Sequence, residues 1–260
     1  MNQPLHPCVV LTGFHRSGTS LVAQKLHRGG VYMGQQMLAS DESNPDGHYE
    51  DHEFLRFHER ALRCSGVDWL VDAAFLRQFD AEQLASITTT ITRRRLLKKA
   101  WGFKDPRVCL YLPFWRRLLP EAVYLVVLRQ PDEIVRSLIQ RAYTVWRQSG
   151  APQNPNVRMI NDLVLPYRCW LQYMETVLHF IGQQQSIVLH LGDALTDATL
   201  QQCLSPYNIN LQATDHLIEQ RADRLQRRRP EIELPAPLRD RVDSTYRKLA
   251  SHAYSDPPNE

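Results

Sequence analysis

A short apolar run that passes directly into a glycine-containing loop constrains this chain more than any other feature. Residues 8–12 are apolar and partly β-branched, the loop of residues 13–20 (GFHRSGTS) follows at once, and a helical pattern covers residues 18–28. A strand, such a loop and a helix in this order can hold phosphate-like groups. Backbone N–H groups turn inward in the loop, and the helix N-terminus adds partial positive charge. The order therefore predicts a P-loop-like anion site near the start of an α/β fold.

Three further runs resemble the first in being short, strongly apolar and bounded by glycine, proline or charged residues. They cover residues 101–103, 123–128 and 187–191. Runs of this kind are typical of parallel strands that are buried on both faces. Helical patterns lie between them, at residues 51–64, 81–100, 132–146 and 157–183.

Strands that alternate with helices predict an α/β fold with three layers, α/β/α, around a central parallel sheet. We expect residues 1–260 to form a single domain, with a helical part from about residue 205. Residues 39–47 and 149–156 have the composition of loops, and we expect the second to be a mobile connection or lid.

Charge, cysteine content and hydropathy exclude several classes of protein. The net charge of +3 is small for a dedicated nucleic-acid binder. No signal-peptide pattern is visible, and the longest apolar run, residues 122–128, is too short for a membrane span. The cysteines are scattered and form no CxxC pair, which argues against a disulfide framework or a zinc site. They are Cys8, Cys64, Cys109, Cys169 and Cys203. We therefore expect a soluble cytoplasmic protein without membrane insertion.

The loop has the glycine spacing of a Walker A motif but lacks its lysine. Gly13 and Gly18 are spaced as in that motif, whereas Thr19 occupies the lysine position and the cation comes earlier, at Arg16. A P-loop kinase-like phosphotransferase would need this lysine and a Mg²⁺-binding aspartate after a strand, and no apolar run ends in aspartate. A tight turn in which the glycines only permit close packing is the simplest alternative.

A second anion site is predicted after the run of residues 123–128. Arg129 follows this run, at the strand end where open α/β sheets bind ligands. Asp132 suits the first turn of a helix because it opposes the helix dipole. Ser137 lies eight residues after Arg129. The two could hold one anion if the helix folds back over the strand end; a surface arginine and an ordinary helical serine are the alternative.

Both motifs resemble those of the PAPS-dependent sulfotransferases. Residues 16–21 (RSGTSL) match the family's loop pattern x-[RK]-S-G-T-[ST]-[LW], and Arg129, Pro131 and Ser137 match R-x-P-x-x-x-x-x-S. The resemblance implies that Arg129 and Ser137 bind the 3′-phosphate of PAPS, a group that ATP lacks. It implies that the 5′-phosphosulfate is held by His15, Arg16, Ser17, Gly18, Thr19 and Ser20. PAPS would be the co-substrate, and no metal would be needed.

Weaker matches extend the resemblance along the chain. Residues 102–106 (GFKDP) resemble a Lys-Asp-Pro element, residues 44–51 (NPDGHYED) an Asn-Pro-x-Gly-x-x-Glu-Asp segment, and residues 191–195 a Tyr-Glu-Asp-Leu element. The glycine-rich nucleotide loop of cytosolic members is not recognisable. Residues 227–229, three consecutive arginines, could replace it.

Sulfuryl transfer needs cations near the bridging oxygen and a base for the acceptor. Arg16 and Lys104 are the expected cations, since both lie at the carboxyl ends of predicted strands. Glu50 is the first choice for the general base, from its position in the residue 44–51 segment.

Three other residues are also candidates for the base: Asp51, Asp105 and His48. Asp51 could instead be a helix N-cap, and Asp105 could instead hold Lys104 or Arg107 in place. His48 lies outside the helix that contains His52, so the two are not expected to bind a metal.

The acceptor would be a hydroxyl or amine compound, most simply a carbohydrate or small molecule. Residues 32–69 and 143–156 are expected to line its pocket, with Tyr143 and Trp146 able to stack on a ring. Tyr167 and Trp170 are expected to belong to the core instead. A protein that kept the fold and bound nucleotide without catalysis is a further alternative.

Overall fold

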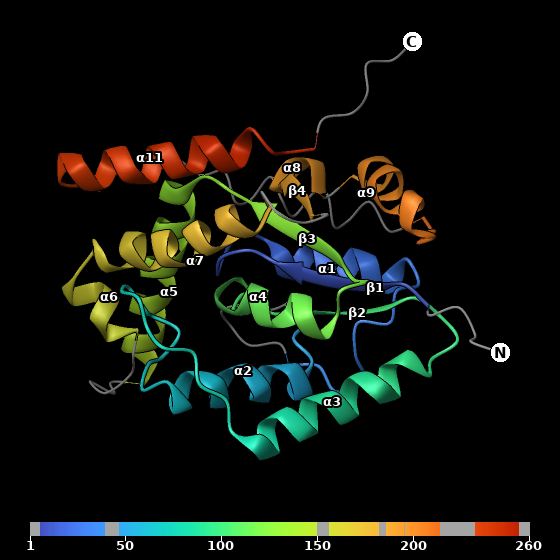
Figure 1. Cartoon of the computed structure of the whole chain (residues 1–260). Coiled ribbons are helices and arrows are strands. Elements are labelled where there is room, and N and C mark those ends of the chain that lie inside the picture. Colours follow the sequence, from blue (N-terminus) through green and yellow to red (C-terminus); the bar gives the residue numbers. More distant parts are fainter. Residues whose placement is uncertain are drawn as a thin grey trace, which may run out of the picture.

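A four-stranded parallel sheet lies at the centre of the molecule (Figure 1). The computed structural model describes residues 6–39, 47–149, 156–181, 186–194, 196–213 and 232–254. The strands are β1 (Cys8–Thr12), β2 (Trp101–Lys104), β3 (Val123–Leu128) and β4 (Ser186–His190), in the order β2-β1-β3-β4. Each predicted run forms a strand. Strand β2 ends one residue later than predicted, and β4 begins and ends one residue earlier. The predicted α/β fold is confirmed.

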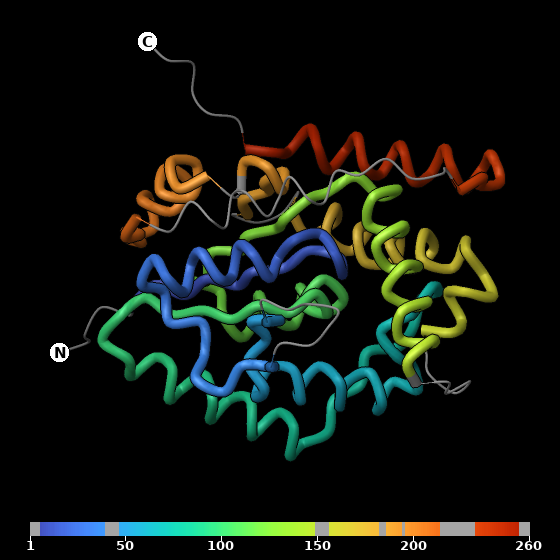
Figure 2. Tube along the Cα trace, turned by 180° about the vertical axis from the view of Figure 1, so that it is seen from behind, coloured from blue at the N-terminus to red at the C-terminus, as the bar shows by residue number. Residues whose placement is uncertain are grey.

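Alternate residues of the strands face two separate cores, which gives the molecule its three layers. Val9 and Leu11 pack with α1 (Thr19–Arg28) and α9 (Asp197–Leu204). Val10 belongs to the larger core on the opposite face. That core includes residues of α2 (His52–Cys64), α3 (Ala81–Arg95), α4 (Val108–Leu118) and α7 (Leu165–Ile181). Accordingly, α4 and α7 lie in front of the sheet in Figure 1, and α1 lies in front of it in the reverse view of Figure 2.

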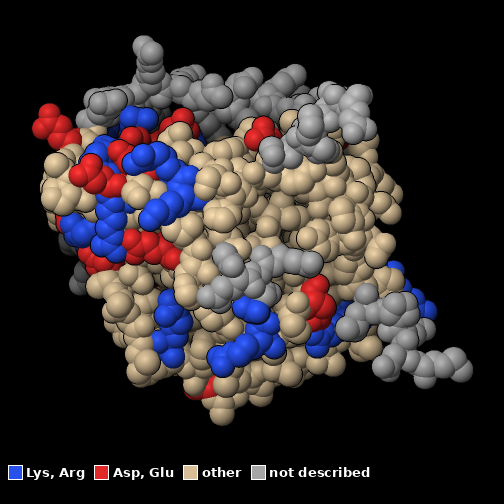
Figure 3. Space-filling view, turned by 45° about the horizontal axis from the view of Figure 1, so that its top comes forward, with Lys and Arg blue, Asp and Glu red and all other residues tan. Residues whose placement is uncertain are grey.

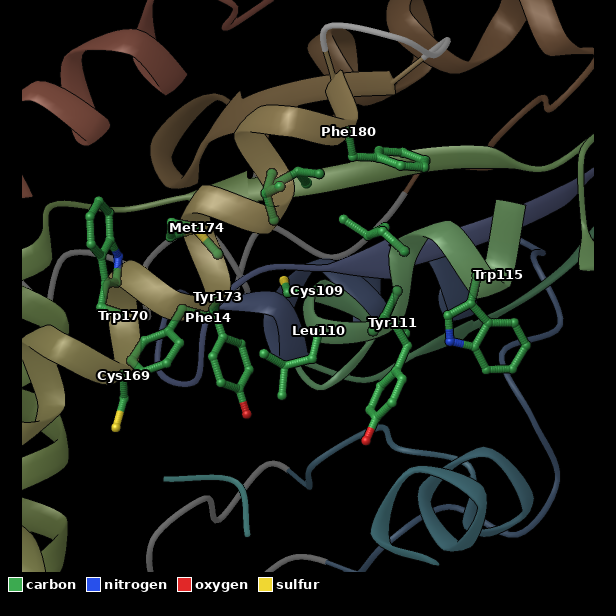
Figure 4. Packing of buried hydrophobic residues seen from close by; sticks show 14 of the residues in the cluster. Phe14, Cys109, Leu110, Tyr111, Trp115, Cys169, Trp170, Tyr173, Met174 and Phe180 are labelled. Atoms are coloured by element: carbon green, nitrogen blue, oxygen red, sulfur yellow. The ribbon is translucent and has the colours of Figure 1, made fainter. Parts of the chain in front are cut away.

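Aromatic side chains fill much of the larger core (Figure 4). Phe14, the second residue of the loop after β1, packs edge to face on Tyr173 of α7, with ring centroids 4.9 Å apart. Tyr167 and Trp170 are fully buried, so their predicted place in the core is confirmed. This packing anchors the start of the loop to α7.

Two helical predictions need correction. The pattern over residues 157–183 is divided into α6 (Val157–Asn161) and α7, because the Asp162 carboxylate accepts hydrogen bonds from the N–H groups of Val164 and Leu165 and begins a new helix. The helix predicted over residues 81–100 ends at Arg95. Helix α4 was not predicted, since Pro113 lies inside it and obscured the pattern.

The remaining elements complete the two outer layers. They are α5 (Pro131–Ser149), α8 (Leu191–Ala194), the 3₁₀ turn η1 (Ser205–Tyr207) and α11 (Ala236–Ala250). None of the helices in the described ranges has the length and apolarity that crossing a bilayer requires. On the face shown in Figure 3, lysines and arginines lie among acidic residues. Arg241 of α11 and Glu175 of α7 form one of the ion pairs between helices, at 2.7 Å.

The sheet has a topological switch point between β1 and β3. These strands are neighbours and parallel, yet α1 packs on one face of the sheet while α5, which follows β3, contributes Ile134 and Leu138 to the core on the other face. Open α/β sheets bind ligands at such a switch point, outside the carboxyl ends of the strands. Both predicted anion sites begin at this edge.

Candidate active site

The loop after β1 has a backbone that only glycine fits at two positions. Gly13 and Gly18 have φ angles of 152° and 94°. A Cβ atom on Gly13 would lie 2.5 Å from the carbonyl oxygen of Val127, and one on Gly18 would lie 2.2 Å from Cδ1 of Leu191. Arg16 is also left-handed, with φ 68°. A loop that alternates in this way curls around a concave surface of N–H groups, which suits an anion.

The N-terminus of α1 and Ser17 supply further groups for an anion. Gly18 caps α1 without a side-chain hydrogen bond, and the first turn of the helix contains no acidic residue. The Ser17 hydroxyl is buried and has no hydrogen-bond partner within the described part of the chain. Leaving such a group unpaired costs about 1–3 kcal/mol, which a ligand oxygen would recover. The loop therefore fits a phosphate or sulfate group.

The two predicted anion sites are in direct contact. Arg16 Nε donates a hydrogen bond to Ser137 Oγ of α5 at 3.0 Å, and Arg129 Nη1 donates to the carbonyl oxygen of Arg16 at 3.0 Å. Arg129 is nearly buried, and its Nε donates to Glu133 at 2.8 Å. The residues predicted after β1 and after β3 are therefore brought together at one edge of the sheet.

Lys104 and Glu50 form a buried ion pair beside this edge. Lys104 Nζ donates to Glu50 Oε1 at 2.7 Å and to the carbonyl oxygen of His48 at 2.9 Å. Arg107 Nη1 lies 3.4 Å from the other Glu50 oxygen. Exposed fractions are only 2% for Lys104 and 6% for Glu50. The carboxylate thus lies between two cations, and His48 contributes its backbone carbonyl to the arrangement.

Asp105 holds Arg107 and is itself fully buried. Trp115 Nε1 donates to His58 Nε2 at 2.9 Å, so the other nitrogen of His58 carries the proton and donates to Asp105 Oδ2 at 3.0 Å. Asp105 Oδ1 accepts from Arg107 at 2.9 Å. Burial opposes ionisation of Asp105, but the charge of Arg107 and the contact with His58 outweigh it and hold the pKa of this carboxyl well below its ordinary value. This geometry matches the positioning role that was the alternative for Asp105.

Asp51 is the N-cap of α2, the structural role that the sequence offered as the alternative to a base. Its Oδ1 caps α2 by accepting from the Glu53 N–H at 2.9 Å, and its Oδ2 pairs with Arg94. Burial raises the pKa of the Asp51 carboxyl. Both of its oxygens are engaged in these contacts, which hold the start of α2 in place.

Two residues near the site, His58 and Trp115, carried no interpretable signal in the sequence. Only folding brings His58 to its two partners, since it lies 47 positions from Asp105 and 57 from Trp115 in the sequence. The triple arginine of residues 227–229, and residues 44–46, lie outside the described residues.

The structure describes part of the region expected to bind the acceptor, including Tyr143 and Trp146 of α5. Tyr143 and Trp146 are 39% and 46% exposed. Tyr143 lines a cavity of about 440 Å³ beside α5, together with Leu163 and Ile232. Within the described ranges, no group of three or more His, Cys, Asp or Glu side chains is arranged to bind a metal ion.

Comparison with known proteins identifies the family. A sequence model described as the sulfotransferase family matches residues 7–197. A putative protein-tyrosine sulfotransferase of Caenorhabditis elegans is 32% identical over 79 residues, a match that spans 30% of each chain. The sulfotransferase domain of the Synechococcus PCC 7002 olefin synthase has the same fold, with a TM-score of 0.53, 14% identity and 98% coverage of both chains. The sulfotransferase domain from the curacin biosynthetic pathway has a TM-score of 0.50 and 12% identity, covering 96% of this chain and 99% of its own. The chain belongs to the sulfotransferase family.

Proposed function

We propose that this chain transfers a sulfuryl group from PAPS to a hydroxyl or amine acceptor, with a carbohydrate or small molecule as the acceptor class. The family membership supports sulfuryl transfer. The observation that carries the choice of donor is the contact between Arg16 and Ser137. It joins the loop after β1 to the helix after β3, so that one bisphosphate nucleotide can reach both.

The residues at this edge suit the two ends of the donor. The loop from His15 to Ser20 would hold the 5′-phosphosulfate, where the Ser17 hydroxyl lacks a partner among the described residues. Arg129 and Ser137 would hold the 3′-phosphate. The Arg16–Ser137 hydrogen bond would then be exchanged for bonds to phosphate oxygens, since charge-assisted bonds are the stronger ones.

Glu50 and Lys104 would act as a coupled pair. Glu50 accepts the acceptor's proton while the acceptor oxygen or nitrogen bonds to sulfur and the bond from sulfur to the phosphate oxygen breaks. The electron pair of that bond stays on the departing adenosine 3′,5′-bisphosphate. Once Glu50 is neutral, the ammonium of Lys104 has lost its counter-charge and its field acts on the departing oxygen together with that of Arg16. No metal is required for this step.

A comparison of ligands tests the donor. Adenosine 3′,5′-bisphosphate without metal should stabilise the full chain, by ~2.7 kcal/mol at about 100-fold above Kd, whereas ATP with Mg²⁺ should do little. The reverse ranking would support the phosphotransferase alternative. Binding of the bisphosphate without transfer of label from ³⁵S-PAPS to any acceptor in a broad panel would support the non-catalytic alternative.

A further inference from the structure

The turn that follows β2 holds a second cation, Arg107, to which neither the donor site nor the base assigns a function. Lys104 ends the strand, and residues 105–107 lead into α4. The Thr12 hydroxyl of β1 donates to the backbone carbonyl oxygen of Asp105 at 3.0 Å, which ties the turn to the centre of the sheet. Two cations and a carboxylate are therefore fixed within four consecutive residues.

Arg107 joins two carboxylates through one nitrogen atom. Its Nη1 donates to Asp105 Oδ1 at 2.9 Å and to Glu50 Oε2 at 3.4 Å. The backbone N–H of Arg107 also donates to Asp105 Oδ1, at 2.8 Å, so the two residues hold each other in place. Only 11% of the Arg107 side chain is exposed. The contact with Glu50 is thus made from a fixed and sheltered position.

The other oxygen of Asp105 is engaged by a neutral group. His58 donates to Asp105 Oδ2 at 3.0 Å, and its second nitrogen accepts from the Trp115 indole, which can only donate. His58 therefore brings no charge to Asp105. Burial opposes ionisation of this carboxyl, but Arg107 and the His58 contact hold its pKa below the ordinary value, so it is anionic at neutral pH. The charges of Asp105 and Arg107 consequently cancel.

The charges of the hydrogen-bonded cluster can be counted before and after proton uptake by the base. Ionised Glu50 and Asp105 contribute two negative charges. Lys104 and Arg107 contribute two positive ones, so the cluster is neutral. When Glu50 takes the acceptor's proton, Asp105 still balances Arg107, and one positive charge remains, on Lys104. Glu59 lies 3.9 Å from Arg107 Nη2 but is 46% exposed, so solvent screens its charge.

We propose that Arg107 is a positioning residue of this enzyme: it aligns Glu50 and cancels the charge of Asp105. Proton uptake by Glu50 then exposes the charge of Lys104 alone. The inference rests on the proposed function, because Glu50 is the base there and Lys104 acts on the departing oxygen. The proton moves from the acceptor's O–H or N–H to Glu50 while the sulfuryl group moves to the acceptor, and Arg107 gains and loses none. Without Arg107, Asp105 would balance Lys104 instead and weaken its field on the departing oxygen.

Changes of charge in the full chain test the inference. The rate is the transfer of label from ³⁵S-PAPS, measured with glucosamine, with 2-naphthol and with water alone as the acceptor. Arg107→Gln keeps a hydrogen-bond donor but loses the charge, so kcat should fall about 10–100-fold, the scale of one uncancelled charge inside a protein. Arg107→Lys keeps the charge and should retain most of the rate, because a single nitrogen makes both contacts.

The decisive variant removes both of the cancelling charges. Arg107→Gln combined with Asp105→Asn leaves Lys104 uncompensated again after proton uptake, so kcat should rise about fivefold or more above that of Arg107→Gln alone. A merely structural role predicts the opposite, since the second change removes a further buried contact. Melting temperatures report whether each variant keeps the fold. If the double variant does not fold, the contrast between Arg107→Lys and Arg107→Gln, which differ in charge, decides the question.

The matched control is Arg60→Gln. Arg60 of α2 also joins two carboxylates, those of Asp80 at 2.5 Å and Glu82 at 2.7 Å, but its side chain is 39% exposed. The change should leave kcat as in the wild type. Adenosine 3′,5′-bisphosphate affinity should stay within about threefold of the wild type in every variant, because the effect of Arg107 is on the chemical step.

Three results would overturn the inference. They are a wild-type kcat in Arg107→Gln, a further fall in kcat when Asp105→Asn is added, and a loss of about tenfold or more in bisphosphate affinity in Arg107→Gln, which would assign Arg107 to the donor. Failure of the proposed function is visible separately, in the wild type, as the absence of label transfer to either acceptor and to water. That result would remove this inference as well.

Discussion

Glu50 is the residue on which the proposed chemistry depends most. Its carboxylate is almost buried and bonded to Lys104 at 2.7 Å. Glu50→Gln keeps the shape of the side chain but cannot accept a proton, so kcat should fall by about 10²–10⁴, the usual contribution of a general base. Adenosine 3′,5′-bisphosphate affinity should change by less than about threefold. Initial rates with PAPS and calorimetry with the bisphosphate measure the two effects.

The matched control for this change is Glu82→Gln, which alters an exposed glutamate of α3. It should leave kcat unchanged. A Glu50→Gln enzyme with the rate of the wild type would mean that another group takes the proton, and His48, Asp51 and Asp105 would need the same test.

Asp105 makes stability depend on pH in a defined direction. The pKa of its carboxyl is held below the ordinary value of 3.8, so the ionised form stabilises the fold. This contribution is fully present above pH 3.8 and is lost as the pH falls below that value toward the folded-state pKa. Asp105→Asn should destabilise the protein at pH 7 by roughly 3 kcal/mol, since Arg107 loses a buried partner.

Urea unfolding across pH 3 to 7 measures this effect as the difference between the wild type and the Asn variant. The difference should be constant near neutral pH and should shrink at the acid end of the range. A difference that is the same at pH 3 and pH 7 would contradict the proposed ionisation of Asp105.

At the scale of elements, the two ends of α1 offer a paired glycine experiment. Gly18 and Gly30 have similar φ angles, 94° and 104°. A Cβ on Gly18 would lie 2.2 Å from Leu191, whereas one on Gly30 would meet nothing within 4 Å. Gly30→Ala should therefore cost only the backbone strain, about 1–2 kcal/mol. Gly18→Ala should cost more and should also weaken bisphosphate binding, because displaced loop N–H groups no longer point at the phosphate.

Thermal unfolding and bisphosphate titration of both variants provide the measurement. Gly30→Ala should retain the affinity of the wild type. If the two variants lose the same stability and neither loses affinity, Leu191 does not restrain the loop and the loop does not hold the nucleotide.

An element could be predicted from the sequence where a continuous apolar pattern marks it, and was missed where one residue decides its start or its shape. The strands were identifiable because burial on both faces makes them continuous apolar runs, as in β3. The break between α6 and α7 was missed because a single carboxylate, that of Asp162, begins the second helix within an unbroken apolar periodicity. Helix α4 was missed because Pro113 is tolerated where Tyr111 already departs from helical geometry, with φ −120°.

At the scale of the whole molecule, the sequence could indicate which residues bear the chemistry but not which of them would meet. Arg16 and Ser137 are 121 positions apart, and only the order of β1 and β3 in the sheet brings them to 3.0 Å. The engagement of Asp105 by His58 and of Asp51 by Arg94 also arises from packing between distant helices. These contacts give Asp105 and Asp51 structural roles that the motif alone offered only as alternatives.

The meeting of the two strand ends can be tested by a double-mutant cycle on nucleotide affinity. If Arg129 and Ser137 bind one 3′-phosphate, each single change to alanine should weaken adenosine 3′,5′-bisphosphate binding, and the double change should weaken it by less than the sum. The coupling should be about 0.5–3 kcal/mol, the range for residues that share a partner. Binding of adenosine 5′-phosphate, which lacks the 3′-phosphate, should be nearly unaffected by all three variants.

The control is a second cycle that combines Arg129→Ala with Arg56→Ala, a change on the surface of α2. Its effects should be additive within about 0.5 kcal/mol. Additive losses in the first cycle, or equal losses for both nucleotides, would mean that the strand ends do not share the phosphate and that their proximity has only a structural cause.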